Sequence, residues 1–323
     1  MTRIGLIGAG GIARRHVEEL SALEDVEITA VVDLDPVQAR WVTDLTGAQF
    51  CKRIEDLLPL IDAAYVLTPP RARVEAISTL AAAGKAIFCE KPLAASVEDA
   101  RRIHELVTAA GIPFMMGFMR RWHPAYARLR ALIDSEQIGQ PMQYFRQRLG
   151  YLPQPHGNWR IDPKQLVGLT VESASHDIDL LRWLGGDIQT ASGQILEEPD
   201  LPGFDHSVNA TFRFANGAIG TLQVTWASYV SQNQVGVIGG DAAAVITGSG
   251  MWRSENITVA SRDQPEQRSQ TFSSAEATDE GYGGQTRTFL ALVRGEEPPH
   301  PSSADGLATV ELSHQILMSS TTL

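Results

Sequence analysis

Short β-rich runs alternate with helical patterns up to about Gly117, and this alternation restricts the folds that the chain can form. Strand and helix repeated in this way predict a doubly wound parallel sheet with right-handed crossovers. Helix boundaries support the pattern, because Pro36 stands at a first turn while Gly84 and Gly111 follow helical runs. The expected strands are residues 3–7, 28–32, 63–67, 86–89 and 114–116. The first expected helix follows the first strand and ends at residue 20, and the later helices span residues 36–45, 71–83 and 96–110.

The pattern changes beyond about Arg120, and after the helix expected to end at residue 184 several β-rich runs follow one another. Asn216-Gly217 lies between two of these runs, and this dipeptide favours a tight hairpin turn. Consecutive hairpins form an antiparallel sheet, so we expect this half of the chain to be α+β. The expected helices are residues 124–135, 164–184 and 302–323, the expected strands are residues 141–149, 188–195, 207–214, 218–226, 234–238 and 243–246, and residues 263–280 are expected to form an exposed hairpin or loop.

Length and charge narrow the class of protein. A chain of 323 residues is long enough for two domains, which we predict over residues 1–120 and 121–323. The 38 acidic and 27 basic side chains leave a net charge of −11, which argues against nucleic acid and anionic membrane surfaces as partners. Cys51 and Cys89 are too few for a disulfide framework, so we expect a cytoplasmic protein.

The first residues imitate a signal peptide, because Met1-Thr2-Arg3 precedes an apolar run over residues 4–13. Four glycines interrupt that run, which favours a strand entering a turn. The long uncharged segment over residues 214–240 is interleaved with polar side chains, so we expect no membrane-spanning segment.

The first expected strand runs directly into a glycine-rich turn, residues 8–13, that matches Gly-x-Gly-x-x-Gly/Ala. In a dinucleotide-binding turn of this kind, Gly8 would allow the tight turn, Gly10 would let the backbone approach a pyrophosphate, and Ala13 would pack closely. The free N–H groups of the following helix would face the phosphates. The other interpretation is an ordinary strand-to-helix turn, but the position between strand and helix favours a Rossmann domain that binds a dinucleotide.

Asp33 ends the second expected strand, twenty residues after Ala13. A carboxylate at this position can accept hydrogen bonds from the adenine ribose hydroxyls and repels a 2′-phosphate. Arg40 lies too far along the next helix to attract that phosphate. The sequence therefore favours NAD over NADP.

Lys91 follows the strand over residues 86–89, where the carboxyl ends of parallel strands face the ligand crevice. A lysine close to a reacting hydroxyl stabilises alkoxide character as hydride leaves, and Pro92 restricts the backbone of Lys91 to an extended form. The other interpretation is a surface lysine paired with Glu90.

Glu172 and His176 stand one helical turn apart on the expected helix of the second half. A carboxylate beside a histidine fixes its tautomer and raises its basicity, as proton abstraction from an alcohol requires. An ordinary surface pair remains an alternative. Together with Asp179 these residues do not form a recognised zinc spacing, so we expect no metal site.

The glycine turn, Glu90-Lys91-Pro92 and the segment from Glu172 to Asp179 occur in this order, and through them the chain resembles the Gfo/Idh/MocA oxidoreductases, the family of glucose-fructose oxidoreductase and inositol 2-dehydrogenase. Lesser matches are Thr68-Pro69-Pro70 and residues 117–122 and 157–160, so the resemblance covers essentially the whole chain. It implies a Rossmann domain followed by a domain with a large, mostly antiparallel open sheet, through which relatives commonly form oligomers. We therefore expect a homo-oligomer, a dimer or a tetramer.

The resemblance also implies roles for particular residues. Lys91 would touch the reacting hydroxyl, often with a cis Lys91-Pro92 bond, and Glu172 and His176 would transfer the proton. We expect the cofactor to be bound by Gly8, Gly10, Gly11, Ile12, Asp33, Thr68, Pro69, Glu90 and Lys91. We expect the substrate to contact Lys91, Tyr151, Trp159, Arg160, His176 and Asp179, with His156 in the same loop as Trp159.

The chain departs from the family's pattern at several positions. Glu172 stands where Asp is more usual, and only Gly168 remains of the glycines frequent before it. Arg73 and Met119 replace a common His and Asn, which we expect to remove polar contacts to the ligand. His16 is interpreted as a residue of helix packing or of the cleft edge.

The sequence thus predicts an NAD-dependent dehydrogenase that moves a hydride between a ring secondary alcohol of a sugar, inositol or related polyol and the nicotinamide. Two alternatives remain at this stage. One is a glycosidase of the same fold that uses tightly held NAD, and the other is a dinucleotide-sensing regulator without catalysis. The presence of both Lys91 and His176 argues against the regulator.

Overall fold

The computed structural model describes residues 1–152, 162, 165–298 and 300–320. The chain forms two compact units: Met1–Phe118 with Tyr282–Val310, and Met119–Gly281 with Glu311–Leu323. The predicted boundary at residue 120 lies close to the first break. The assignment of all later residues to the second domain is wrong, because Tyr282–Val310 packs with the first unit.

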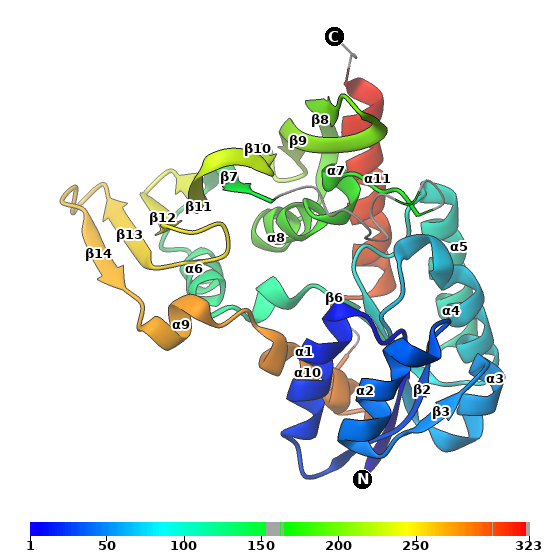
Figure 1. The fold of residues 1–323 in the computed structure, drawn as a ribbon. Helices are drawn as coiled ribbons and strands as arrows, with labels where there is room; N and C mark the ends of the chain where they lie inside the picture. The colour runs from blue at the N-terminus through cyan, green and yellow to red at the C-terminus, as the bar shows by residue number, and fades with distance from the viewer. Residues whose placement is uncertain (153–161, 163–164, 299, 321–323) are drawn as a thin grey trace. The chain divides into compact units, whose positions relative to one another are not determined.

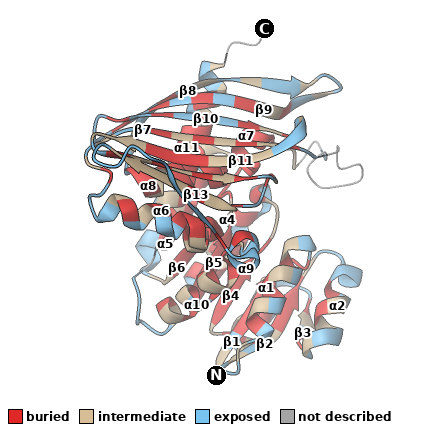
Figure 2. Ribbon diagram, turned by 90° about the vertical axis from the view of Figure 1, so that its left-hand side faces the viewer, coloured by how far each residue is buried: buried red, intermediate tan, exposed pale blue. Residues whose placement is uncertain are grey.

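The first unit contains a six-stranded parallel sheet in the order β3-β2-β1-β4-β5-β6; Figure 1 labels β2, β3 and β6, and Figure 2 labels all six strands. The strand order reverses between β1 and β4, which is where doubly wound sheets bind their ligands. The predicted parallel sheet is confirmed, although β3 and α3 were not predicted because they are too short to show a period. The strands are β1 (Thr2–Ile7), β2 (Val26–Val32), β3 (Gln49–Cys51), β4 (Ala63–Val66), β5 (Ala86–Glu90) and β6 (Phe114–Gly117).

A helix from late in the sequence completes the first unit. α10 (Tyr282–Val293) brings Phe289 edge-on to Tyr65 of β4 and Phe88 of β5, with ring centroids 5.3 and 5.6 Å apart. These aromatic contacts bury a large apolar area, which explains why this segment belongs to the first unit. The other helices are α1 (Gly11–Ser21), α2 (Pro36–Thr46), α3 (Ile54–Leu57), η1 (Leu58–Leu60), η2 (Pro70–Ala72), α4 (Arg73–Ala82) and α5 (Val97–Ala110).

The second unit is built on an eight-stranded sheet in the order β14-β13-β12-β11-β7-β10-β9-β8. Only the β7–β10 pair among these described strands is parallel, so the predicted mostly antiparallel sheet is confirmed. Buried and exposed residues alternate along β9 and β10, which shows that the sheet packs on its core with one face (Figure 2). The strands are β7 (Pro141–Tyr151), β8 (Ile188–Glu198), β9 (Leu201–Phe214), β10 (Ile219–Thr225), β11 (Ala227–Gly239), β12 (Ala242–Gly248), β13 (Asn256–Ser261) and β14 (Arg268–Thr271).

The predicted hairpin at Asn216-Gly217 joins β9 to β10. Gly217 adopts a φ of +88°, and its N–H donates to the carbonyl of Phe214 at 3.0 Å. Asn216 has no positive φ, so the turn is a three-residue loop that ends in a left-handed glycine rather than a two-residue type I′ turn.

The helix predicted over residues 164–184 is not continuous. The structure has α7 (Leu169–Glu172) and α8 (Ser175–Gly185), with Ser173 and Ala174 between them. Hydrogen bonds to the side-chain carboxylate of Asp205 explain where α7 begins. The Asp205 side chain accepts from the backbone N–H of Thr170 at 2.8 Å and from the Thr170 hydroxyl at 2.5 Å.

The remaining segments of the second unit include an exposed strand and several helices. Residues 263–280, predicted as an exposed hairpin or loop, contain the edge strand β14 and also the short helix α9, which begins with a capping box from Ser273 and Glu276. No helix in the described part of the chain is long and apolar enough to cross a membrane. The other helices are η3 (Met119–Trp122), α6 (Pro124–Asp134), α9 (Ser274–Thr278) and α11 (Ser303–Ser319), whose residues up to Val310 belong to the first unit.

Asp205 gives the second unit a pH-dependent stability that can be measured. Burial raises the pKa of this carboxyl to about 6 against the two hydrogen bonds from Thr170. Because the folded pKa lies above the unfolded one, the ionised form opposes folding, and this part of the stability is lost as the pH rises from about 4 to about 6.

We therefore expect Asp205→Asn to gain stability relative to the wild type by about 3 kcal/mol between pH 4 and pH 7, from a shift of about two pKa units. Urea unfolding at both pH values measures this difference. Exposed Asp200→Asn is the control and should show no such change. A difference between Asp205→Asn and the wild type that does not vary with pH would contradict the prediction.

Candidate functional site

Gly8 stands at the point where the strand order of the first unit reverses. Its φ is +99°, and its N–H donates to the carbonyl of Val32 at 2.8 Å. A Cβ at this position would lie 3.1 Å from the carbonyl carbon of Leu67 and 3.2 Å from the nitrogen of Thr68. Only glycine therefore allows the turn to pass this close to the segment after β4.

Gly10 and Gly11 have a different role, because a Cβ at either position would meet no atom within 4 Å. Gly10 is the N-cap of α1, and no side chain caps the helix. Ala13 is fully buried and Ile12 is half-buried. The first turn of α1 thus leaves open space beside uncapped backbone N–H groups, which fits a pyrophosphate.

Asp33 follows β2, and the backbone holds its side chain beside the glycine turn. One carboxylate oxygen accepts from the N–H of Ala9 at 2.7 Å, and the other accepts from the N–H of Asp35 at 2.9 Å. The Trp41 indole donates to the carbonyl of Ala9 at 2.9 Å and fixes the same turn from the other side. The negative charge is therefore placed where an adenine ribose binds in folds of this type.

Lys91 is the first residue after β5, and the peptide bond between Lys91 and Pro92 is cis. The Glu90 carboxylate accepts from the backbone N–H of Lys91 at 3.0 Å, while its other oxygen bonds Nε2 of His16 at 2.9 Å. His16 is completely buried against aromatic rings, so its interpretation as a helix-packing residue is correct. Glu90 thus uses its side chain to fix the chain around Lys91.

Arg73 is buried beneath the same segment, with 2% of its surface exposed. Its guanidinium donates to the carbonyls of Thr68 at 2.8 Å, of Lys91 at 3.4 Å, and of Glu90 and Pro92. Arg73 was expected to remove a polar contact to the ligand. In the structure it instead joins the segment after β4 to the segment after β5.

In the second unit, Glu172 is the last residue of α7 and His176 is the second residue of α8. Both are 6% exposed. The Ser175 hydroxyl donates to the carbonyl of Glu172 at 2.9 Å, across the break between the two helices. The predicted face of one continuous helix is therefore wrong, but burial excludes the alternative of an ordinary surface pair.

Asp179 differs from its predicted place in the wall of the substrate site. It is fully buried, and its two oxygens accept from Nε and Nη2 of Arg121 at 3.0 and 2.6 Å. This bidentate ion pair joins η3 to α8 inside the second unit. We therefore assign Asp179 to the packing of the second unit rather than to the substrate.

The other predicted substrate residues fall into two groups. Tyr151 is 53% exposed and stacks on Tyr229, with ring centroids 5.0 Å apart. Trp159, Arg160 and His156 lie outside the described residues. Among the residues that the structure describes, no three His, Cys, Asp or Glu side chains are grouped to hold a metal ion.

Comparison with known families decides the cofactor. Residues 2–118 match the model of the oxidoreductase family with an NAD-binding Rossmann fold, and residues 126–246 match the GFO/IDH/MocA C-terminal domain. The chain belongs to the Gfo/Idh/MocA oxidoreductases. It is an NAD-binding oxidoreductase, and the glycine turn and Asp33 are arranged as that cofactor requires.

Named relatives of this family member include dehydrogenases. The chain is 26% identical over 328 residues to myo-inositol 2-dehydrogenase of Thermotoga maritima, covering 97% of this chain and 94% of that protein. It is 35% identical over 199 residues to inositol 2-dehydrogenase 3 of Saccharopolyspora erythraea, covering 60% of this chain and 56% of that protein. A putative myo-inositol dehydrogenase from Sinorhizobium meliloti has 26% identity and a TM-score of 0.79, with 99% of this chain and 97% of that chain covered.

Sequence reasoning missed the buried arginines of this Gfo/Idh/MocA protein. Arg146 and Arg148 stand two residues apart on β7 and therefore share one face of the strand. Their side chains are fully buried against α8. Hydrophobic alternation would have turned Phe145 and Leu149 toward the core instead. The available signal was Asp177, an acidic residue on the helix that packs against the strand.

The charge of Asp33 should control cofactor affinity. We expect Asp33→Asn to weaken NAD binding by about 10- to 100-fold, because bonds from the ribose hydroxyls to a charged group are replaced by bonds to a neutral one. Binding of NADP should weaken less or improve, because the repulsion of its 2′-phosphate is removed.

Titration of NADH and NADPH fluorescence measures both affinities. The matched control is Asp35→Asn, since Asp35 caps α2 through the N–H of Val37 and asparagine caps equally well. Equal NAD affinity in the Asp33→Asn variant and the wild type would contradict the assignment of Asp33 to the ribose.

Removal of the Arg73 guanidinium should destabilise the first unit. We expect Arg73→Met to lower the free energy of unfolding by about 2 kcal/mol or more, because buried carbonyls lose their donors. Urea unfolding measures the change, and exposed Arg40→Met should stay within about 0.5 kcal/mol of the wild type. A neutral effect of Arg73→Met would show that these carbonyls do not depend on Arg73.

Proposed function

We propose that this protein oxidises a ring secondary alcohol of a sugar, inositol or related polyol with NAD. The observation that carries the proposal is the fixation of Lys91: its N–H is held by Glu90, and the carbonyls around it are held by a buried guanidinium. A main chain held on both sides gives the Lys91 amine a fixed origin. The inositol dehydrogenases among the relatives support the substrate class.

The proposed chemistry uses Lys91, His176 and Glu172, as the family resemblance implies. Lys91 donates a hydrogen bond to the substrate oxygen and stabilises the negative charge that develops there. His176 accepts the hydroxyl proton, and the Glu172 carboxylate raises the basicity of His176. Bound NAD, held by the glycine turn and Asp33, supplies the acceptor for the hydride.

We also propose that the protein self-associates through the outer face of the eight-stranded sheet. Phe145 and Leu149 of β7 lie on that face, because the alternation of β7 turns Arg146 and Arg148 inward. A shallow hollow of about 850 Å³ lies on the sheet and is lined in part by Phe145, Gln147 and Gln223. Half-buried apolar side chains among neutral amides suit contact with a second copy.

A reduction screen tests the function. Sugars, inositols and polyols are offered with NAD, and NADH absorbance is followed. We expect turnover of at least one cyclic polyol, with kcat/KM lowered about 100-fold or more in Lys91→Met, because one donor to a developing oxyanion contributes about that factor.

Exposed Lys52→Met is the matched control and should keep wild-type turnover. NAD binding by both variants, measured by calorimetry, separates loss of chemistry from loss of the cofactor. Turnover by Lys91→Met within a few-fold of the wild type would contradict the role of Lys91. Absence of NADH formation from every polyol would contradict the proposed function.

A further inference from the structure

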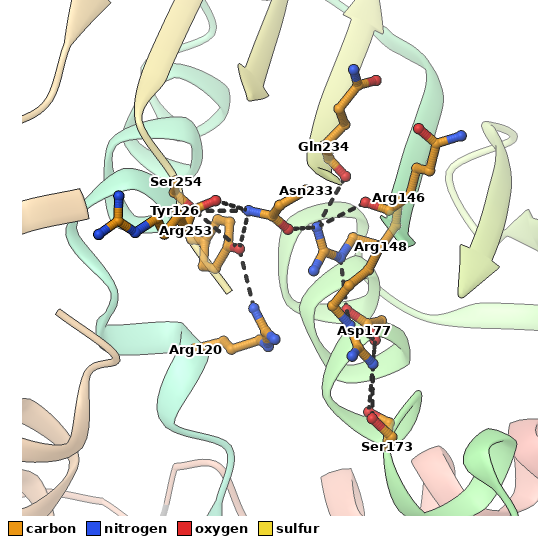
Figure 3. Close-up of polar contacts among 11 residues, drawn as sticks. Arg120, Tyr126, Arg146, Arg148, Ser173, Asp177, Asn233, Gln234, Arg253 and Ser254 are labelled. Atoms are coloured by element: carbon orange, nitrogen blue, oxygen red, sulfur yellow. Dashed lines mark hydrogen bonds and ion pairs between the residues drawn. The ribbon is translucent and has the colours of Figure 1, made fainter. Parts of the chain in front are cut away.

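Three buried arginines of the second unit lie near one carboxylate, which forms ion pairs with two of them (Figure 3). Arg120 of η3 is 3% exposed, and Arg146 and Arg148 of β7 are 1% and 0% exposed. Asp177 of α8 is fully buried and bonds Arg146 and Arg148, and it is the one negative side chain bonded to any of the three arginines among the described residues. The segments outside the described residues contain no Asp or Glu. The cluster therefore holds two more positive charges than negative ones.

Asp177 satisfies only part of this cluster. Its oxygens accept from Nε of Arg146 at 2.7 Å and from Nη2 of Arg148 at 2.7 Å. The two arginines hold the pKa of Asp177 well below its usual range against the effect of burial. Arg148 also donates to the Ser173 hydroxyl at 2.9 Å, and Arg146 donates to the carbonyl of Gln234 at 3.0 Å and to the side-chain oxygen of Asn233.

Other guanidinium nitrogens of the same arginines are buried without an acceptor in the described part of the chain. They are Nη2 of Arg146, Nη1 of Arg148, and both Nε and Nη2 of Arg120. In Figure 3 the guanidinium groups of Arg120, Arg146 and Arg148 extend toward one region, with Asp177 at its side. Water could accept from these N–H groups, but it would not neutralise the charge, and an uncompensated buried charge costs several kcal/mol.

The phenol of Tyr126 reports the positive potential of this region. Its oxygen lies within hydrogen-bond distance of Nη1 of Arg120 at 3.1 Å, the Asn233 amide at 3.3 Å and the Ser254 hydroxyl at 3.2 Å. Burial raises the pKa of Tyr126, yet the charges of Arg146 and Arg120 outweigh burial and bring it below its ordinary value. The surroundings thus favour a second anion.

Trp252 connects the cluster to solvent. Its ring lies 4.6 Å from the guanidinium carbon of Arg148 and 5.3 Å from that of Arg120, and the residue is 44% exposed. The Trp252 ring thus contacts two of the arginines and reaches the surface of the second unit. The cluster also contacts Ser173 and Asp177, the chain neighbours of Glu172 and His176.

We propose that Arg120, Arg146 and Arg148 form an oxyanion-binding site beneath Trp252, which takes a carboxylate, phosphate or sulfate group. Guanidinium groups recognise these anions through paired N–H donors, and four such donors are present without an acceptor. The anion either belongs to an acidic substrate or binds as a free ion. The site stands independently of the proposed function, since binding requires no turnover.

Calorimetric titration of the full-length protein tests the site, with sodium sulfate, sodium phosphate and sodium glucuronate as probes and glucose as the neutral control. We expect the anions to bind the wild type and to bind Arg120→Gln at least about tenfold more weakly, because one charge and two unpaired donors are removed. Arg120 makes a single side-chain hydrogen bond, to Tyr126, so this variant keeps the Asp177 network intact. Arg213→Gln, an exposed arginine of β9, is the matched control for general anion effects.

A second measurement does not depend on the folding of a variant. A bound anion should raise the pKa of Tyr126, so sulfate should shift the phenolate absorbance titration of the wild type to higher pH, and Tyr126→Phe identifies the signal. Sulfate that displaces glucuronate, with turnover of the sugar acid, places the anion on the substrate. Sulfate that binds without displacing a substrate supports a free ion.

The proposal is overturned if sulfate leaves the Tyr126 titration unchanged and the calorimetry shows either no anion binding or equal binding by the wild type and Arg120→Gln. A protein that binds sulfate but oxidises no polyol would keep this site and contradict only the proposed function.

Discussion

The buried guanidinium of Arg73 organises the ligand side of the first unit, because it joins two strand ends that the fold places next to each other. It donates to the carbonyl of Thr68 after β4 and to the carbonyls around Lys91 after β5. The glycine turn packs against the same segment after β4, since Gly8 lies against Leu67 and Thr68. The positions of the cofactor turn and of Lys91 are thus fixed by backbone contacts, which tolerate little change in geometry.

In the second unit, buried ion pairs between side chains hold the elements together. Asp177 lies between Arg146 and Arg148 and ties α8 to β7, and Arg121 binds Asp179 two residues further along. These ion pairs join α8, the helix that carries His176, to β7 and to η3. Buried charges are costly when they are unpaired, so the excess of arginine beside Asp177 marks a ligand site rather than simple packing.

Most of the architecture followed from local patterns. The parallel sheet, the antiparallel sheet and the hairpin at Gly217 were predicted, since strand and helix periods and turn residues act within a few positions. The return of Tyr282–Val310 to the first unit was not predicted, because it rests on contacts of Phe289 with residues about 200 positions earlier in the chain. The point where α7 begins was missed for a similar reason, since the N–H of Thr170 donates to Asp205, which lies on β9 35 residues later in the chain.

The sequence by itself determined the residue types of the site: the glycine turn, Asp33, Glu90-Lys91-Pro92, Glu172 and His176. Their chemistry and short spacing are local properties of the chain. Only the tertiary structure decided what surrounds them. It placed Arg73 under Lys91, took Asp179 into an ion pair with Arg121, and turned Arg146 and Arg148 inward. The reason is physical: a buried charge is stable only where distant parts of the chain supply its partners, and no local pattern in the sequence records which parts those are.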